Sequence, residues 1–422
     1  MVLPGYIPST GFIGSIKPSI GFTFGDQADI RYEVARNGWL TNFPNFNQSF
    51  TQVHNNSLNI AAQWSPFKDL VVDFNLENNY SENSSENYRV EDLEYVPLNP
   101  NFHGNFGTST ILLKTAFKSS DGTFNPVFET FRNNRIKIAT RLAATSEITN
   151  QEIDDDGFPI GYGKNNQLVL IGAFISAYTG IPPEEVKTDP LNKSSLPNWN
   201  MKFTGFNNLK SFKKIFQRFT LSHGYRASYT INNFQANLDF DSNNLDKIDG
   251  AGNYINKRIF SNINLVEQFN PLIRLDIELK NSFKLLAELK KDRALSLSLD
   301  NSLLTESFGN EYIIGFGYRF KNLKMNTRIG GRRSTLKGDL NIKADISYRK
   351  NQTILRNLEY DNNQVTAGQT QLSIKFSSDY SISQNFTALL FYDHNFSEFA
   401  ISTAFPQTTI RSGITIRYNF GN

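Results

Sequence analysis

Side chains that commonly carry out chemistry are sparse in this 422-residue chain. There is no cysteine, which excludes a disulfide scaffold, a thiolate zinc site and a Cys nucleophile. The four histidines are His54, His103, His223 and His394, and no two of them pair at metal-ligand spacing. No nucleophile elbow, phosphate loop or dinucleotide fingerprint occurs. We therefore expect no catalytic residue, no enzyme activity and no cofactor.

Two groups of acids and one histidine have alternative interpretations. Asp239-Phe-Asp241 resembles the start of a calcium loop, but the required Gly and the final Glu are missing, so solvated loop acids are favoured. The run Asp154–Asp156 is interpreted in the same way. His223 lies on an apolar stripe, which favours a hydrogen-bonded structural histidine over a metal ligand. We therefore expect no metal site.

Composition narrows the class of protein. Aromatic residues make up 13% of the chain, with 36 Phe and 17 Tyr, which together with the low net charge argues against disorder. The longest apolar run, 168–175, is far shorter than the roughly 20 residues of a spanning helix. A net charge of +3 argues against a nucleic-acid partner. Met1 is not followed by a basic and then apolar leader, so no signal peptide is expected there.

The dominant pattern alternates apolar and polar residues, as β-strands do. It is clearest over 70–80, 219–231, 273–279 and 340–348, and it recurs at 58–64, 294–303, 311–320, 372–380 and 410–420. These stripes are long, and the polar face carries full charges of both signs. A barrel with lipid outside and water inside requires this arrangement, whereas high β propensity alone would leave a soluble β-protein possible.

We therefore predict an all-β fold, a transmembrane antiparallel β-barrel of the outer membrane with about 16 strands in this chain. Its polar side chains should line a hydrated lumen. The candidate lumen-lining residues are Arg274, Asp276, Glu278, Lys280, Lys343, Asp345, Arg349, Arg411 and Arg417.

Connections and strand ends fit a barrel. Short connections are expected at 65–69, 269–271, 307–310 and 381–385, and longer ones at 241–257, 323–337 and 397–407, as for periplasmic turns and external loops. Aromatics that end many stripes could form a girdle at the membrane surface; these are Tyr80, Phe283, Phe320, Tyr348, Tyr380 and Phe420.

One region has helical spacing instead. Residues 124–145 and 166–178 predict two helices, and 209–216 a third, short one. We therefore divide the chain into 1–117 (barrel strands with an amino-terminal loop segment), 118–197 (a helical insertion on the rim or within the lumen) and 198–422 (barrel strands). The basic cluster Lys213, Lys214 and Arg218 is expected near a membrane face.

The chain's last stripe ends almost at the terminus. Aromatic and apolar residues alternate through Gly413, Ile416, Tyr418 and Phe420. This resembles the assembly signal that the bacterial outer-membrane insertion machinery reads; an ordinary last strand is the alternative.

Five passages closely resemble one family. They are Leu3–Phe12 (LPGYIPSTGF), Phe131–Leu142 (FRNNRIKIATRL), Gly161–Gly180 (GYGKNNQLVLIGAFISAYTG), Leu196–Trp199 leading into Leu221–Thr230 (LSHGYRASYT), and Asn310–Phe320 (NEYIIGFGYRF). Together they resemble the SprA/Sov family, the outer-membrane translocons of the type IX secretion system in Bacteroidota. Family members are several times longer, so the resemblance implies that this chain is a carboxy-terminal part and contributes an arc of a larger barrel.

The resemblance further implies that the chain functions in protein export. Cargo proteins with carboxy-terminal sorting domains, including gliding adhesins, would cross the outer membrane through the lumen. The implied partners are outer-membrane lipid, a barrel of the PorV/LptO type and a periplasmic plug protein. Two alternatives remain: a stand-alone outer-membrane porin or receptor-type transporter, and a barrel enzyme, for which no nucleophile and base are visible.

Overall fold

The computed structural model describes residues 6–8, 16–18, 29–43, 49–148, 152–192, 194–329, 332–360, 362–381, 385–401, 405–418 and 420. Most of the passage Leu3–Phe12 lies outside this part of the chain. Among the described residues, no helix is both long and apolar enough to span a membrane.

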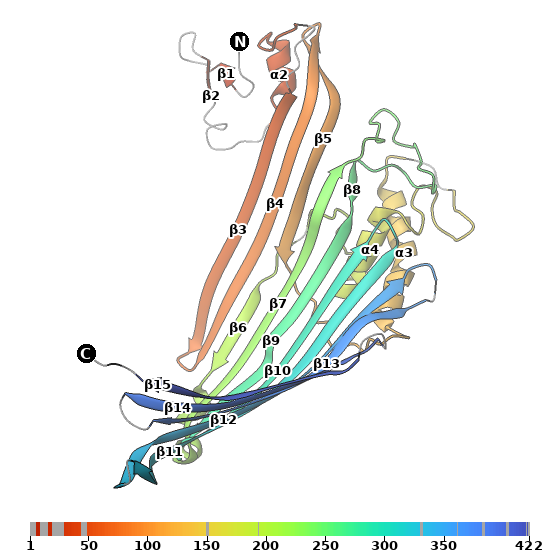
Figure 1. Cartoon of the computed structure of the whole chain (residues 1–422). Coiled ribbons are helices and arrows are strands. Elements are labelled where there is room, and N and C mark those ends of the chain that lie inside the picture. Colours follow the sequence, from red (N-terminus) through yellow and green to blue (C-terminus); the bar gives the residue numbers. More distant parts are fainter. Residues whose placement is uncertain are drawn as a thin grey trace.

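One large antiparallel sheet dominates the molecule (Figure 1). Eleven strands follow one another across it in the order β15-β14-β13-β12-β11-β10-β9-β7-β5-β4-β3, and β6 and β8 pair beside this path. The strands are β3 (Ser49–Phe67), β4 (Leu70–Glu91), β5 (Glu94–Ser109), β6 (Asn198–Phe203), β7 (Phe216–Ala236), β8 (Arg258–Phe260), β9 (Asn262–Leu279), β10 (Phe283–Ser298), β11 (Leu303–Ile329), β12 (Arg332–Asn357), β13 (Gln364–Ser381), β14 (Phe386–Phe399) and β15 (Gln407–Tyr418). The fold is therefore all-β, as expected.

Outside the sheet, β1 (Tyr6–Pro8) pairs with β2 (Ile16–Pro18), and a short helix α2 (Arg31–Arg36) packs near β5. Arg31 of α2 forms an ion pair with Glu86 of β4, with 2.6 Å between Nη1 and Oε1. This contact fixes α2 at the upper end of β4.

β5 and β6 occupy the same position between β4 and β7. β5 pairs with the distal half of β4, over Asn78–Glu91, and β6 with its first residues, over Leu70–Asn75. The chain therefore leaves the sheet after β5, forms the helical insertion within residues 110–197, and re-enters the sheet as β6 beside the same strand, β4.

The insertion contains the two long helices that helical spacing predicted. α3 (Pro126–Thr145) begins at Asn125, whose side chain accepts hydrogen bonds from the N–H groups of Val127 and Phe128. α4 (Gln167–Thr179) begins at Asn166 in the same way and ends at Gly180, which has a left-handed φ of 69°. The third expected helix is α5 (Lys210–Ile215).

The strands are fewer and longer than the alternation pattern suggested. The described residues form fifteen strands, thirteen of them in the large sheet, against the expectation of about 16. β11 and β12 pair out to Ile329 and Arg332, so the connection expected at 323–337 is mostly a hairpin. The expected turn at 269–271 is an irregularity within β9, where the pairing with β10 shifts register between Leu289 and Lys291.

The expected turn at 307–310 was also wrong, because these residues lie inside β11. Gly309, which looked like a turn residue, faces Arg349 and Asp292, and a Cβ atom there would come within 2.9 Å of both side chains. The glycine therefore makes room for a cross-strand ion pair and does not reverse the chain.

Candidate functional site

The sheet's most regular feature is a polar face that runs across the carboxy-terminal strands. Residues directly opposite one another form a transverse row from β9 to β15: Asp276, Leu286, Gly315, Asp345, Lys375, Asp393 and Arg411. Because side chains alternate along each strand, this row fixes which residues share its face. Eight of the nine candidate lumen residues lie on it, and Lys280 lies in the turn after β9.

Opposite charges are paired along this face. Arg218 lies 3.1 Å from Asp276, Arg274 lies 3.3 Å from Glu288, and Arg411 lies 2.6 Å from Asp393. Arg349 contacts both Asp292 (2.9 Å) and Glu311 (3.5 Å). The sequence could predict the charges but not these partners, because the partners come from neighbouring strands. The face is polar and carries charges of both signs.

The opposite face carries a continuous apolar band. One row across it consists of Leu275, Ala287, Ile314, Ile346, Ile374, His394 and Ile410, all directly opposite their neighbours. The band continues through Leu221 on β7 and Phe203 on β6 to Leu70 on β4. On β12 it extends from Leu340 to Tyr348, about 27 Å at the usual rise per residue.

Much of this band is exposed in the isolated chain. Ile314 is 47% exposed, Ile346 41% and Ile410 57%. A contiguous apolar surface of this size on a protein requires a cover of apolar material.

Aromatic side chains border the band on both sides. Phe386 contacts Tyr418 at the lower border, with ring centroids 6.3 Å apart, and Tyr312 contacts Tyr348 at the upper border, at 6.5 Å. Tyr80, which was expected in a girdle, lies elsewhere: it stacks on Phe234 at 6.0 Å and donates a hydrogen bond to Glu82. β4 continues for eleven residues beyond Tyr80, to Glu91, whereas it joins the apolar band near Leu70. The last apolar residue of the alternating pattern on β4 therefore does not mark the border of the band.

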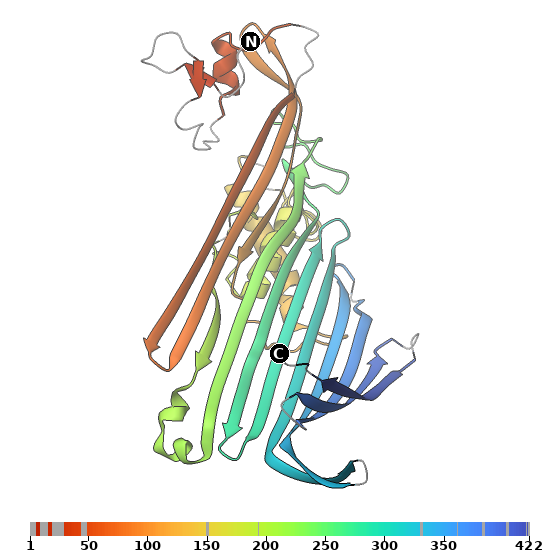
Figure 2. The same ribbon diagram turned by 60° about the vertical axis from the view of Figure 1, so that its left-hand side comes forward.

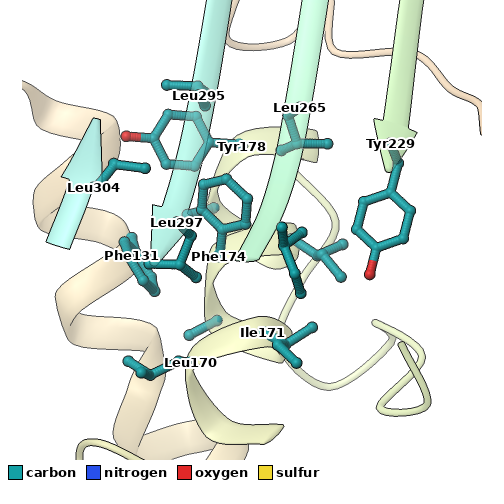
Figure 3. Close-up of a cluster of buried hydrophobic side chains, with 14 of the residues drawn as sticks. Phe131, Leu170, Ile171, Phe174, Tyr178, Tyr229, Leu265, Leu295, Leu297 and Leu304 are labelled. Atoms are coloured by element: carbon teal, nitrogen blue, oxygen red, sulfur yellow. The ribbon is translucent and has the colours of Figure 1, made fainter. Parts of the chain in front are cut away.

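The helical insertion packs on the same face as the apolar band. β10 is paired with β11 without interruption, so Leu285, Leu289, Leu295 and Leu297 all point to one side. Figure 3 shows Leu295 and Leu297 packed against Phe174 and Tyr178 of α4. The helices therefore cover the upper part of the face whose lower part is the band. The helices α3 and α4 therefore do not lie on the polar face, where the candidate lumen residues are.

Two buried arginines of the sheet each form an ion pair within the sheet and a hydrogen bond to the backbone of the insertion. Arg293 contacts Glu267 at 3.0 Å and donates to the carbonyl of Thr115. Arg356 contacts Glu306 at 2.8 Å, and both side chains are almost completely buried. Arg356 also donates to the carbonyl of Asp121.

Sequence reasoning missed these four charged residues, although a signal was present. Glu267 interrupts the apolar stripe between Leu265 and Phe269, and Arg293 lies on the same face of the sheet between Leu289 and Leu295. A charge at such a position requires a buried partner, which only the tertiary structure identifies.

The other candidate residues have local roles. His223 lies 2.7 Å from the carbonyl oxygen of Leu272 through Nδ1, which confirms a structural, hydrogen-bonded histidine. Asp241 and Asp154 accept hydrogen bonds from N–H groups of their own loops. Within the described ranges, no three His, Asp or Glu side chains are grouped closely enough to hold a metal ion.

The four residues of the expected assembly signal lie at the open end of the sheet. Ile416 and Tyr418 lie on the apolar face of β15, and Gly413 lies on the polar face. Phe420 is beyond the strand, 91% exposed, with its ring 4.8 Å from that of Tyr418. β15 pairs with β14 alone among the described strands, as β3 pairs with β4.

Comparison with known proteins gives little further information. No family model matches the chain, and no curated protein matches it. Among solved structures, one similar chain is OmpT, an outer membrane protein of Vibrio cholerae, folded in vitro and in its trimer form. The alignment covers 88% of this chain and 99% of OmpT, with 8% identity and a TM-score of 0.21. The description of the fold therefore rests on this chain's own strand pairing.

Proposed function

We propose that this chain forms part of the wall of an outer-membrane β-barrel that conducts proteins. The observation that carries the membrane part is the apolar band, which crosses the sheet from β4 to β15 while charges occupy the opposite face. Lipid is the apolar cover that such a band requires, and inside the sheet the backbone groups of neighbouring strands pair with one another.

Among the described strands, β3 and β15 each pair on one side alone, which supports an arc of a larger wall and argues against a closed pore. β3 and β15 end the path of strands, and open edges cannot face lipid. Further strands would have to continue the sheet at both ends. The five passages that resemble the SprA/Sov family support the same proposal, because that family's barrels are larger than eleven strands can enclose.

The polar face suits diverse protein cargo. Its charges are of both signs and several are paired with one another, so it presents neither an apolar surface nor a strong field for one kind of ion. In this proposal, cargo with carboxy-terminal sorting domains passes along the polar face. A PorV/LptO-type barrel and a periplasmic plug protein are the partners, and gliding adhesins are among the cargo.

Single cysteines test the membrane part, since the chain has none of its own. Lys343→Cys and Asp345→Cys on the polar face of β12 should react with a membrane-impermeant maleimide in intact outer membranes. Ile342→Cys and Ala344→Cys, on the apolar face of the same strand, should react only after detergent is added. Equal reactivity of the two pairs would rule out the assignment of the faces.

A secretion assay tests the translocon part separately. In cells that lack this chain, a fluorescent reporter with a carboxy-terminal sorting domain should accumulate in the periplasm, and the restored gene should return it to the cell surface. Normal secretion without the chain would reject export as its function. A selective loss of small-solute uptake in the same cells would instead support the porin or receptor-type transporter.

A further inference from the structure

A compact segment, 204–219, closes the end of the sheet between β6 and β7. It contains a 3-10 turn, η1 (Gly205–Asn208), and α5, and we call it the foot. Figure 2 shows it at the lower end of the strands, beside the turn that joins β9 to β10. The N–H of Lys280 in that turn donates to the carbonyl of Ile215, at 3.1 Å, and so ties the foot to the sheet.

Four phenylalanine rings of the foot form one cluster. The ring of Phe206 lies 5.5 Å from that of Phe212 and 5.2 Å from that of Phe219, and Phe212 lies 5.0 Å from Phe216. The cluster is continuous with the apolar band, because Phe219 is directly opposite Ile277. Beside it, two further apolar side chains are turned out to the surroundings: Leu209 is 50% and Ile215 58% exposed.

Three exposed lysines accompany these apolar groups. Lys210, Lys213 and Lys214 all belong to α5, and 204–219 contains no Asp or Glu. Arg218 is already paired with Asp276, at 3.1 Å, and with Glu278, at 3.8 Å. Asp69, in the turn before β4, accepts a hydrogen bond from Asn208. In the part of the chain that the structure describes, none of the three lysines has an ion-pair partner.

We infer that the foot binds the headgroups of anionic phospholipids in the leaflet that it borders. This rests on the proposed membrane-spanning function. Apolar and aromatic groups enter the boundary of the acyl chains while lysines remain at the level of the phosphates, as in interfacial helices. Short connections occur at both ends of the sheet, but the long connection 237–257 lies at the end away from the foot. Long loops are typical of the external side, which leaves the foot on the periplasmic side, next to the phospholipid leaflet.

Quenching by labelled lipid measures this preference directly. Outer membranes from cells that produce the Ser211→Cys variant, labelled with a fluorophore on α5, are fused with phosphatidylcholine vesicles that contain phosphatidylglycerol, so that the chain stays in its assembled wall. The quencher is carried either by phosphatidylglycerol or by phosphatidylcholine. We expect labelled phosphatidylglycerol to be enriched at the fluorophore by at least about five-fold, the factor that a single one of the three lysines contributes near an anionic surface.

Two triple variants identify the lysines as the cause. Lys210→Gln, Lys213→Gln and Lys214→Gln together should bring the ratio close to one. The matched triple Lys284→Gln, Lys343→Gln and Lys375→Gln removes the same charge from the polar face of the sheet and should leave the enrichment unchanged.

The outcomes separate this inference from the function on which it rests. A chain that inserts but is quenched equally by both lipids, or whose preference survives the first triple variant, overturns the lipid site alone. Loss of binding to a periplasmic protein in that variant, with the lipid preference intact, would also overturn it. A chain that is absent from the outer membrane of the cells that produce it would overturn the membrane-spanning function as well.

Discussion

Arg293 and Arg356 each interrupt an apolar-face stripe, and each is buried where the insertion covers the sheet. Taking a guanidinium and a carboxylate out of water is costly, and their attraction offsets that cost only if both remain. The positions of these two arginines on the sheet thus fix the position of the insertion, because each donates a hydrogen bond to its backbone. Their partners come from different segments, since Arg356 contacts Glu306 on the neighbouring strand and the backbone of Asp121 in the insertion.

Removal of one member of the Arg356–Glu306 pair should be strongly destabilising. Arg356→Met leaves a buried carboxylate without its counter-ion, and we predict a loss of about 3–5 kcal/mol in the free energy of unfolding. Chemical denaturation of the protein folded in detergent micelles would measure this. The double variant Arg356→Met, Glu306→Gln removes both charges and should recover most of the loss; no recovery would contradict a purely electrostatic cause.

Asp121 should make the insertion sensitive to acid. The backbone N–H of Phe124, together with the hydroxyl and N–H of Thr123, lowers the pKa of Asp121 from 3.8 to about 2. A lowered pKa means that the carboxylate's contribution to stability is present above pH 3.8 and is lost as the pH falls through about 2.

We predict that protease resistance of 118–145 declines over this pH range in the unmodified chain. The decline should be smaller in Asp121→Asn, which should already be less resistant at pH 7. Asp155→Asn, in another loop of the insertion, is the control and should behave as the unmodified chain does.

At the scale of elements, the insertion and the apolar band share one face of the sheet. α4 is buried on both sides, against the sheet and against α3, which explains why its sequence is apolar all round. The two helices approach closely at Gly172, where a Cβ atom would lie 2.9 Å from Cγ2 of Ile138. α3 contacts the sheet as well, since the guanidinium of Arg356 lies over the ring of Phe128, 5.7 Å from its centroid, so the two helices pack side by side on the sheet.

Gly172→Val should separate the two helices. Inserting methyl groups into a packed interface typically costs about 1–3 kcal/mol, so we predict a loss of this size and earlier proteolysis within the insertion. Ile138→Ala in the same chain makes space at that contact, so the double variant should be less destabilised than the sum of the two single changes. Additivity would indicate that the clash occurs elsewhere.

The apolar band allows a prediction for one strand element. Ile346 faces the band and Ser347 the polar face of β12, where the Ser347 hydroxyl donates to Glu311. Ile346→Arg should lower the stability of the membrane-inserted protein by about 2–4 kcal/mol if it lies near mid-membrane. Ser347→Arg gains a carboxylate neighbour and should be tolerated. The amount of heat-modifiable protein in the outer membrane would distinguish them, and equal amounts would contradict the assigned faces.

At the scale of the whole molecule, the sheet is long, twisted and open. β3 and β15 end the path of strands, and neither pairs with the other in the described residues. Open edges expose unpaired backbone groups and invite further strands. The isolated chain thus has two edge strands with unpaired backbone groups and an exposed apolar band. A larger barrel would pair the edge strands, and a membrane would cover the band.

Closure of the sheet on itself can be tested by disulfide formation. We combine one cysteine on β3, at Asn55, Ser57 or Asn59, with one on β15, at Thr409 or Thr415. A disulfide requires Cα atoms within about 7 Å, so an open arc should give no cross-link within the chain for any pair. Mass spectrometry after mild oxidation would detect one, and an efficient cross-link would show that these strands close a small barrel.

The sequence alone predicted the features that depend on local periodicity. Side chains alternate along a strand by geometry, so the apolar and polar sides of β9, β12 and β15 could be read directly, and the two long helices followed from their spacing and caps. Strand ends were less predictable. Gly309 and Pro271 look like turn residues in the sequence, yet both lie within strands because contacts across the sheet override local preference.

Only the tertiary structure decided which segments meet. It joined β5 and β6 into one strand position, placed the helices on the side of the apolar band, and paired Arg293 with Glu267 and Arg356 with Glu306. These outcomes depend on register between strands that are far apart in the chain, and a one-residue shift would exchange the two faces. The alternation of residues determines which side chains of one strand share a face. The register between neighbouring strands determines whether those faces join into one polar surface and one apolar surface across the sheet.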